Sequence, residues 1–153
     1  MSGVKAILIA LVAWINANTA LHYDPAKGMP QVIPLPVDAV VALSFRNPAM
    51  ITPDRFSKAR ETLQAAYDDQ RQLIYIRDDV DLNTVKGKAM LVHELVHHIQ
   101  YRMGMNDQVP CQDALEKDAY LTQAKWLKEH GLEPSFSAFT VLVRSMCWRE
   151  PAR

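Results

Sequence analysis

The sequence predicts an α+β fold, with a small sheet early in the chain and helices late. Two mostly apolar segments, 63–67 and 73–77, flank a polar turn near the middle. After them, apolar residues recur at helical spacing in three successive segments. Strands followed by helices are typical of α+β domains. Because 153 residues can bury a substantial core, residues 1–153 are expected to form one domain.

Residues 1–20 have two interpretations. Lys5 precedes an apolar run at 6–15, and the small residues Ala17 and Ala20 follow it, which is the outline of a secretory signal. The other interpretation is a packed first helix from Val4 to about Thr19. The run is shorter than the roughly 18–20 apolar residues of a membrane-spanning helix, so no stable membrane span is expected.

The middle of the chain is expected to hold short elements. Residues 31–36 are extended, and two prolines restrict this segment to an edge position or a short strand. Asp38 is expected to cap a short helix over 39–43, and Thr52 a second helix that runs to Arg60. The segments 63–67 and 73–77 form a hairpin, with Ile74 and Ile76 on one face of its second strand.

Three helices are expected to complete the chain. The first runs from Lys86 to Met103 and ends at Gly104, a left-handed cap residue. The second begins with a cap at Asp113, followed by Glu116 as in a capping box, and runs to about His130. The last spans roughly residues 135–148, with Ser135 or Ser137 as its cap.

Charge and cysteine content exclude some classes of function. Lys plus Arg and Asp plus Glu each number 17, so the formal charge is zero. Without a basic stripe, no nucleic-acid partner is expected. Cys111 and Cys147 either form one disulfide or remain buried thiols. The location is expected to be periplasmic or secreted if residues 1–20 act as a signal and the cysteines pair, and cytoplasmic otherwise.

The strongest motif is His93-Glu94-Leu95-Val96-His97. Two histidines four residues apart share one face of a helix and can bind one metal ion. A glutamate directly after the first histidine can hold a water molecule, as in the H-E-x-x-H motif of zinc peptidases. His98 is expected to have no ligand role.

A catalytic zinc needs three protein ligands. Glu116, nineteen residues after His97, is the strongest candidate for the third, because a short loop can bring the next helix back to the histidine pair. Ala119 shares its face and is small enough for the two helices to approach closely. Asp113, Asp118 and His130 are the alternative ligands.

The pentad, Glu116 and the following Ala119-Tyr120 together resemble a gluzincin metallopeptidase, and within that class the short zincin-like proteins with little beyond a catalytic core. The resemblance implies a zincin-like minimal fold, with a small N-terminal sheet or hairpin, an active-site helix and C-terminal helices. Larger gluzincins often have an aspartate four residues after the ligand glutamate, to support a zinc histidine. Here that residue is Tyr120, so the sequence leaves the support of His93 unassigned.

This resemblance implies a zinc-dependent peptidase with Zn²⁺ on His93, His97 and Glu116, and Glu94 as general base. Tyr120 is the first choice for the donor to the oxyanion, ahead of three other candidates: Tyr101, His130 and Arg144. By similarity to zincins, Leu73–Arg77 is expected to be an edge strand that pairs with an extended peptide or protein substrate. The alternative is a non-catalytic zinc-binding or protein-interaction domain on the same fold, which would have no need of a base at Glu94. The sequence does not indicate an oligomeric state.

Overall fold

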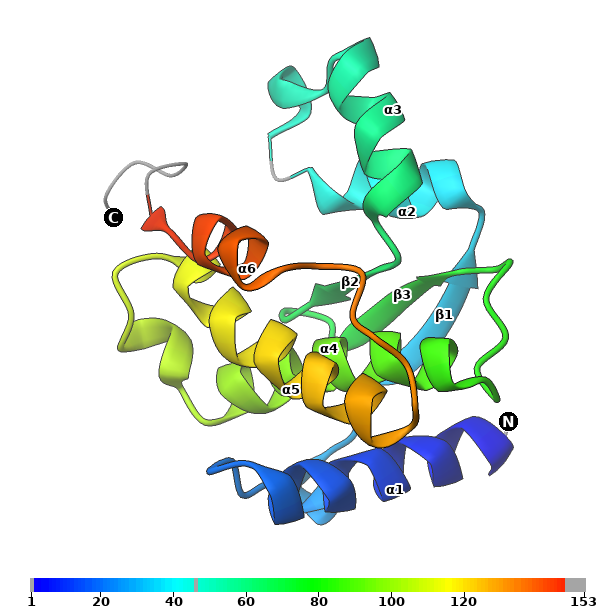
Figure 1. The fold of residues 1–153 in the computed structure, drawn as a ribbon, viewed down its shortest axis with the longest axis vertical. Coiled ribbons are helices and arrows are strands. Elements are labelled where there is room, and N and C mark those ends of the chain that lie inside the picture. The colour runs from blue at the N-terminus through cyan, green and yellow to red at the C-terminus, as the bar shows by residue number, and fades with distance from the viewer. Residues whose placement is uncertain (1, 46, 148–153) are drawn as a thin grey trace.

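A three-stranded sheet and six α-helices make up the computed structural model, which describes residues 2–45 and 47–147 (Figure 1). The elements in chain order are α1 (Ser2–Asn18), β1 (Gln31–Leu35), α2 (Val37–Ser44), α3 (Pro53–Thr62), β2 (Ala65–Asp68), β3 (Leu73–Arg77), α4 (Val85–Arg102), α5 (Glu116–Glu129) and α6 (Ala138–Arg144). Short 3-10 helices also occur, including Met105–Asp107 and Gln112–Leu115 between α4 and α5. The long helices α4 and α5 follow the sheet, which confirms the predicted α+β class.

The sheet has the strand order β1-β3-β2. β2 and β3 form the predicted antiparallel hairpin, with Ala65 opposite Ile76. β1 pairs in parallel with the other side of β3, with Gln31 opposite Leu73. The prediction that β1 lies at an edge is confirmed, but the prediction that Leu73–Arg77 is an edge strand is wrong. β3 is the central strand because β1, far upstream in the sequence, occupies the side of β3 that the hairpin leaves open.

Both faces of β3 are covered. Ile74 and Ile76 are fully buried in the main core, on the face that α4 covers. Tyr75 points to the opposite face, as the alternation predicts, yet it is also buried. Helix α2 packs against β2 and β3 there and contributes the buried Val40 and Val41.

Helix α1 supplies one wall of the core. Its buried side chains recur at helical spacing and pack against α4: Leu8, Leu11, Val12 and Ile15. The ring of Trp14 meets that of Trp126 on α5 edge to face, with centroids 5.1 Å apart. This packing agrees with one of the two interpretations of the segment, a packed first helix. Among the described residues, no helix is long and apolar enough to cross a membrane.

Helix α4 begins and ends one residue earlier than the sequence predicts. The Thr84 side chain accepts a hydrogen bond from the Gly87 amide, and Gly104, with φ of 73°, follows the last turn. A Cβ atom at Gly87 would lie 2.1 Å from the carbonyl oxygen of Asp81. Only glycine therefore allows the loop before α4 to pack this closely on its first turn.

Two helix starts differ from the predictions, and the last helix is shorter than expected. Pro36, not Asp38, precedes α2, and the Asp38 carboxylate accepts a hydrogen bond from Arg60 instead. The capping box at Asp113 does not form, because a 3-10 turn precedes α5 and the Glu116 carboxylate faces the histidines of α4. α6 begins after the cap residue Ser137 and ends at Arg144, while Trp148 lies outside the described residues.

Cys111 and Cys147 form a disulfide, which is the first of the two alternatives that the sequence allowed. The bond ties the segment after α6 to the segment that leads into α5. It therefore encloses the whole of α5 and α6 in one covalent loop.

Candidate metal centre

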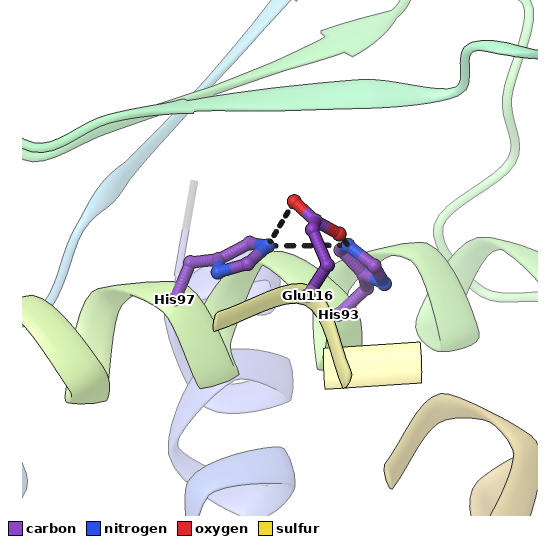
Figure 2. Close-up of side chains that lie close together, drawn as sticks. All are labelled: His93, His97 and Glu116. Atoms are coloured by element: carbon purple, nitrogen blue, oxygen red, sulfur yellow. Dashed lines mark hydrogen bonds and ion pairs between the residues drawn. The ribbon is translucent and has the colours of Figure 1, made fainter. Parts of the chain in front are cut away.

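Three side chains from α4 and α5 converge on one point (Figure 2). His93 and His97 lie one turn apart on α4, and Glu116 is the first residue of α5. Ala119, with no exposed surface, lets the two helices approach closely. Helices α4 and α5 run antiparallel, since the Leu115 carbonyl oxygen bonds to Gln100 while Gln123 bonds to His93. The three residues predicted as ligands are therefore brought together.

The spacing of the three groups suits a metal ion. The Nε2 atoms of His93 and His97 are 3.2 Å apart. The Glu116 oxygens lie 3.1 Å from Nε2 of His93 and 3.0 Å from Nε2 of His97. Ligand atoms about 2.0–2.1 Å from a tetrahedral zinc ion are separated by roughly 3.3 Å. The observed separations are close to this value.

The protonation of His97 follows from its neighbour Gln100. The Gln100 Nε2 group donates to the carbonyl oxygen of Leu115 at 3.0 Å, and a carbonyl oxygen can only accept. The Gln100 Oε1 atom must therefore face His97 Nδ1, 3.0 Å away, and accept its proton. In the neutral form of the ring, the Nε2 atom of His97 therefore carries a lone pair that points at His93 and Glu116.

Gln123 supports His93 through its side-chain carbonyl oxygen. Its Oε1 atom lies 3.0 Å from His93 Nδ1. The support of His93, which the sequence left unassigned, is thus an amide from two turns further along α5. With both Nδ1 protons used, two imidazole lone pairs and a carboxylate face one another without a donor. Such a set of acceptors repels itself unless a cation or a proton lies between them.

The charges at the centre are strongly coupled. Burial alone would lower the pKa of His97 and raise that of Glu116. The attraction and hydrogen bonds between these groups prevail, so the pKa of His97 rises to about 9 and that of Glu116 falls well below its usual range. A proton is therefore held among the three groups at neutral pH when no metal is present. Metal binding has to displace that proton.

The Glu94 carboxyl group lies close enough to His93, His97 and Glu116 to interact with their charges. The Glu94 side chain is buried, and burial raises the pKa of its carboxyl group, against the attraction of His93 and His97. A carboxylate in such surroundings takes up a proton more readily than one in water.

The comparisons place the chain in a family. A family model described as a domain of unknown function, DUF6647, matches residues 2–152. The chain belongs to that family. No curated protein and no solved structure matches it.

Tyr120 of this DUF6647 domain also lies at the centre. Its ring meets that of His93 edge to face, with centroids 4.5 Å apart. The Arg144 guanidinium on α6 donates to the Tyr120 hydroxyl oxygen at 2.6 Å. Arginine has only donors, so the Tyr120 oxygen must accept and its own proton stays available. Arg144, one of the predicted alternatives to Tyr120, therefore reaches the centre through Tyr120.

Two other candidates from the sequence, His130 and Tyr101, contact aromatic residues of the DUF6647 domain. His130 stacks on Trp126 and bonds the Trp126 carbonyl oxygen, near the far end of α5. Tyr101 packs near Tyr67 of β2. Among the described residues, the cluster that could hold a metal contains neither Asp113 nor Asp118.

Both ring nitrogens of His98, which is not expected to be a ligand, are used in structural hydrogen bonds. Its ring is fully buried and points away from His97, between β2 and the loop at Gly28. Because the Gly28 carbonyl oxygen only accepts, His98 Nε2 carries the proton, and Nδ1 accepts from the Tyr67 hydroxyl at 2.8 Å. Burial lowers the pKa of His98, so the ring stays neutral. This pair fixes β2 over α4.

The amides Gln100 and Gln123 were not identified as functional from the sequence. A signal for both exists in the helical period. Gln100 lies three residues after His97, and Gln123 lies seven residues after Glu116, so each shares a face with a candidate ligand.

Proposed function

We propose that this protein is a zinc-dependent peptidase with a gluzincin-like site. The observation that carries the proposal is the convergence of two imidazole Nε2 atoms and a carboxylate next to the buried carboxyl group of Glu94. A purely structural site has no need of such a base. The order of elements, a small sheet followed by α4 and α5, is also the one expected for a minimal zincin-like core.

His93, His97 and Glu116 would hold the zinc ion. When bound, zinc supplies a Lewis acid that polarises a peptide carbonyl and makes a water molecule easier to deprotonate. Imidazole nitrogen and carboxylate oxygen are both common zinc ligands, so the donor set fits this metal.

Glu94 would move the proton. Its carboxylate accepts a proton from the attacking water molecule and delivers it to the nitrogen of the leaving amine. The raised pKa that burial causes suits both steps, because it strengthens the carboxylate as a base while the acid form can still release the proton.

Tyr120 would stabilise the charge that develops on the carbonyl oxygen. Its hydroxyl proton is free because the oxygen accepts from Arg144, and its ring lies against His93. A positioned donor of this kind typically contributes about 10²–10³-fold to the rate.

The free edge of β2, rather than β3, would bind an extended peptide. The Arg77 amide donates to the Gln64 carbonyl oxygen, and hydrogen-bonded pairs alternate along an antiparallel ladder. The backbone groups of Ala65 and Tyr67 therefore face outward, and no further strand in the described sheet pairs with them. Strands of the sheet pass above the three side chains in Figure 2. Pairing at this edge would bring a substrate backbone close to the centre.

Zinc content and hydrolysis of a mixed peptide library, assayed on the same samples, test the proposal. We expect one zinc per wild-type chain, zinc lost in His97→Ala, and zinc retained in Glu94→Gln with activity lowered at least about 100-fold. The exposed residues His22 and Glu61 provide the matched controls His22→Ala and Glu61→Gln, which should behave as wild type. Full activity of Glu94→Gln would exclude the proposed mechanism. Zinc binding without hydrolysis would favour the non-catalytic zinc domain.

A further inference from the structure

We infer that two neutral amides, Gln100 and Gln123, set the charge and metal affinity of the centre. We also infer that the two positions differ in whether a carboxylate can replace the amide. The Gln123 amide can be replaced by a carboxylate with a gain in zinc affinity, whereas the Gln100 amide cannot. This inference rests on the proposed zinc site but not on peptidase activity.

Gln100 needs both ends of its amide. The side chain is fully buried, with Oε1 toward His97 and Nε2 toward the Leu115 carbonyl oxygen, each at 3.0 Å. Leu115 directly precedes Glu116, so this one side chain joins a ligand on α4 to the backbone that carries the ligand on α5. A carboxylate at position 100 would keep the bond to His97 but place an anion against the Leu115 oxygen. Two buried acceptors in contact destabilise the fold.

Gln123 uses only its acceptor at the centre. Its Oε1 atom faces His93 Nδ1 at 3.0 Å, and no carbonyl oxygen among the described residues accepts from its Nε2 group. Glutamate has the same shape as glutamine and can accept the same proton. A carboxylate at position 123 would therefore keep the geometry and add one negative charge.

The absence of that charge matters for the metal. A divalent ion with one carboxylate ligand, Glu116, keeps a net positive charge, and Glu94 is the other carboxyl group coupled to the histidines. Arg144 bonds to the Tyr120 hydroxyl, and the Tyr120 ring in turn contacts His93. Carboxylate support of a ligand histidine raises its basicity and strengthens metal binding, and loss of such support typically costs 10–100-fold in affinity. Amide support therefore leaves a centre that binds zinc less tightly and polarises a substrate more strongly.

The test measures the zinc Kd of metal-free protein by competition with a chromophoric chelator at fixed pH. We expect Gln123→Glu to lower the Kd about 10-fold, and Gln123→Met, which has no acceptor of comparable strength, to raise it about 10-fold. Gln108→Glu adds the same charge at an exposed position and should leave the Kd unchanged. Gln100→Glu should melt at a lower temperature than wild type and bind zinc more weakly.

Each outcome decides. An unchanged or raised Kd in Gln123→Glu would overturn the inference, because a merely structural glutamine predicts that result. Zinc binding by Gln100→Glu as tight as that of Gln123→Glu would overturn the difference between the two amides. If Gln100→Glu does not fold, this supports the inference that the protein does not tolerate a carboxylate at position 100. The Gln123 variants alone then measure the effect of charge on the zinc Kd. Wild type that binds no zinc would overturn both this inference and the proposed function, whereas zinc binding without hydrolysis would overturn only the latter.

Discussion

Helices α4 and α6 both contribute to the centre, but the protein holds them in opposite ways. On α4, every residue from Leu91 to Gln100 is buried, including both histidines and Glu94. On α6, only Val141 is buried, while Phe139 and Leu142 are 73% and 59% exposed. The candidate ligands thus belong to the most enclosed element, and Arg144 to one of the least enclosed. The geometry that would bind a metal is set by the core, whereas the contact of Arg144 with Tyr120 depends on a helix with few apolar attachments.

The largest contrast should come from matched leucine truncations. Leu95 on α4 has no exposed surface, so Leu95→Ala should lower the free energy of unfolding by about 2–5 kcal/mol. Leu142→Ala on α6 removes the same atoms from an exposed site and should change it by less than about 0.5 kcal/mol. Urea denaturation measures both values. Equal losses would show that α6 is packed as firmly as α4.

Loss of the disulfide should have the next largest effect and should fall first on α6. Cys147→Ser opens a covalent loop that joins residues 36 positions apart. We expect a loss of about 3 kcal/mol in global stability. Hydrogen exchange should accelerate in α6 while the amides of α4 stay protected. The double variant Cys111→Ser with Cys147→Ser is the control, and added reductant should affect wild type alone. Unchanged exchange in α6 would show that its other contacts suffice to hold it.

Zinc should produce the smallest of these effects, on α4 and α5. At a free zinc concentration ten times the Kd, wild type should gain about 1.4 kcal/mol in stability. His97→Ala should gain nothing, and His22→Ala should gain as much as wild type. Thermal melts with and without a chelator provide the measurement. An equal zinc-induced gain in His97→Ala would place the binding site elsewhere.

The sequence predicted the centre better than it predicted the sheet. The two candidate ligands on α4 follow from the helical period alone, and Glu116 follows from a short connection between helices that must pack together. The position of β3 depended on β1, a segment whose prolines indicate an edge strand but not which strand it borders. Long-range strand pairing leaves no mark in the local pattern.

The supporting amides show a second limit of the sequence. The sequence has no carboxylate at the spacing expected for support of the histidines, because glutamines bond to their Nδ1 atoms instead. Gln123 faces His93 only because α4 and α5 run antiparallel, so that a later residue on one helix lies opposite an earlier residue on the other. The relative shift of the two helices, which decides the contact, comes from packing at small residues such as Ala119.

The buried ring of His98 has a practical consequence. Its Nε2 proton is enclosed between α4 and the carbonyl oxygen of Gly28, and its other nitrogen holds the Tyr67 hydroxyl of β2. A proton so protected exchanges slowly with water and should give its own resonance far downfield in a proton NMR spectrum. That signal would report, without any ligand or label, whether the edge strand rests on the helix beneath it.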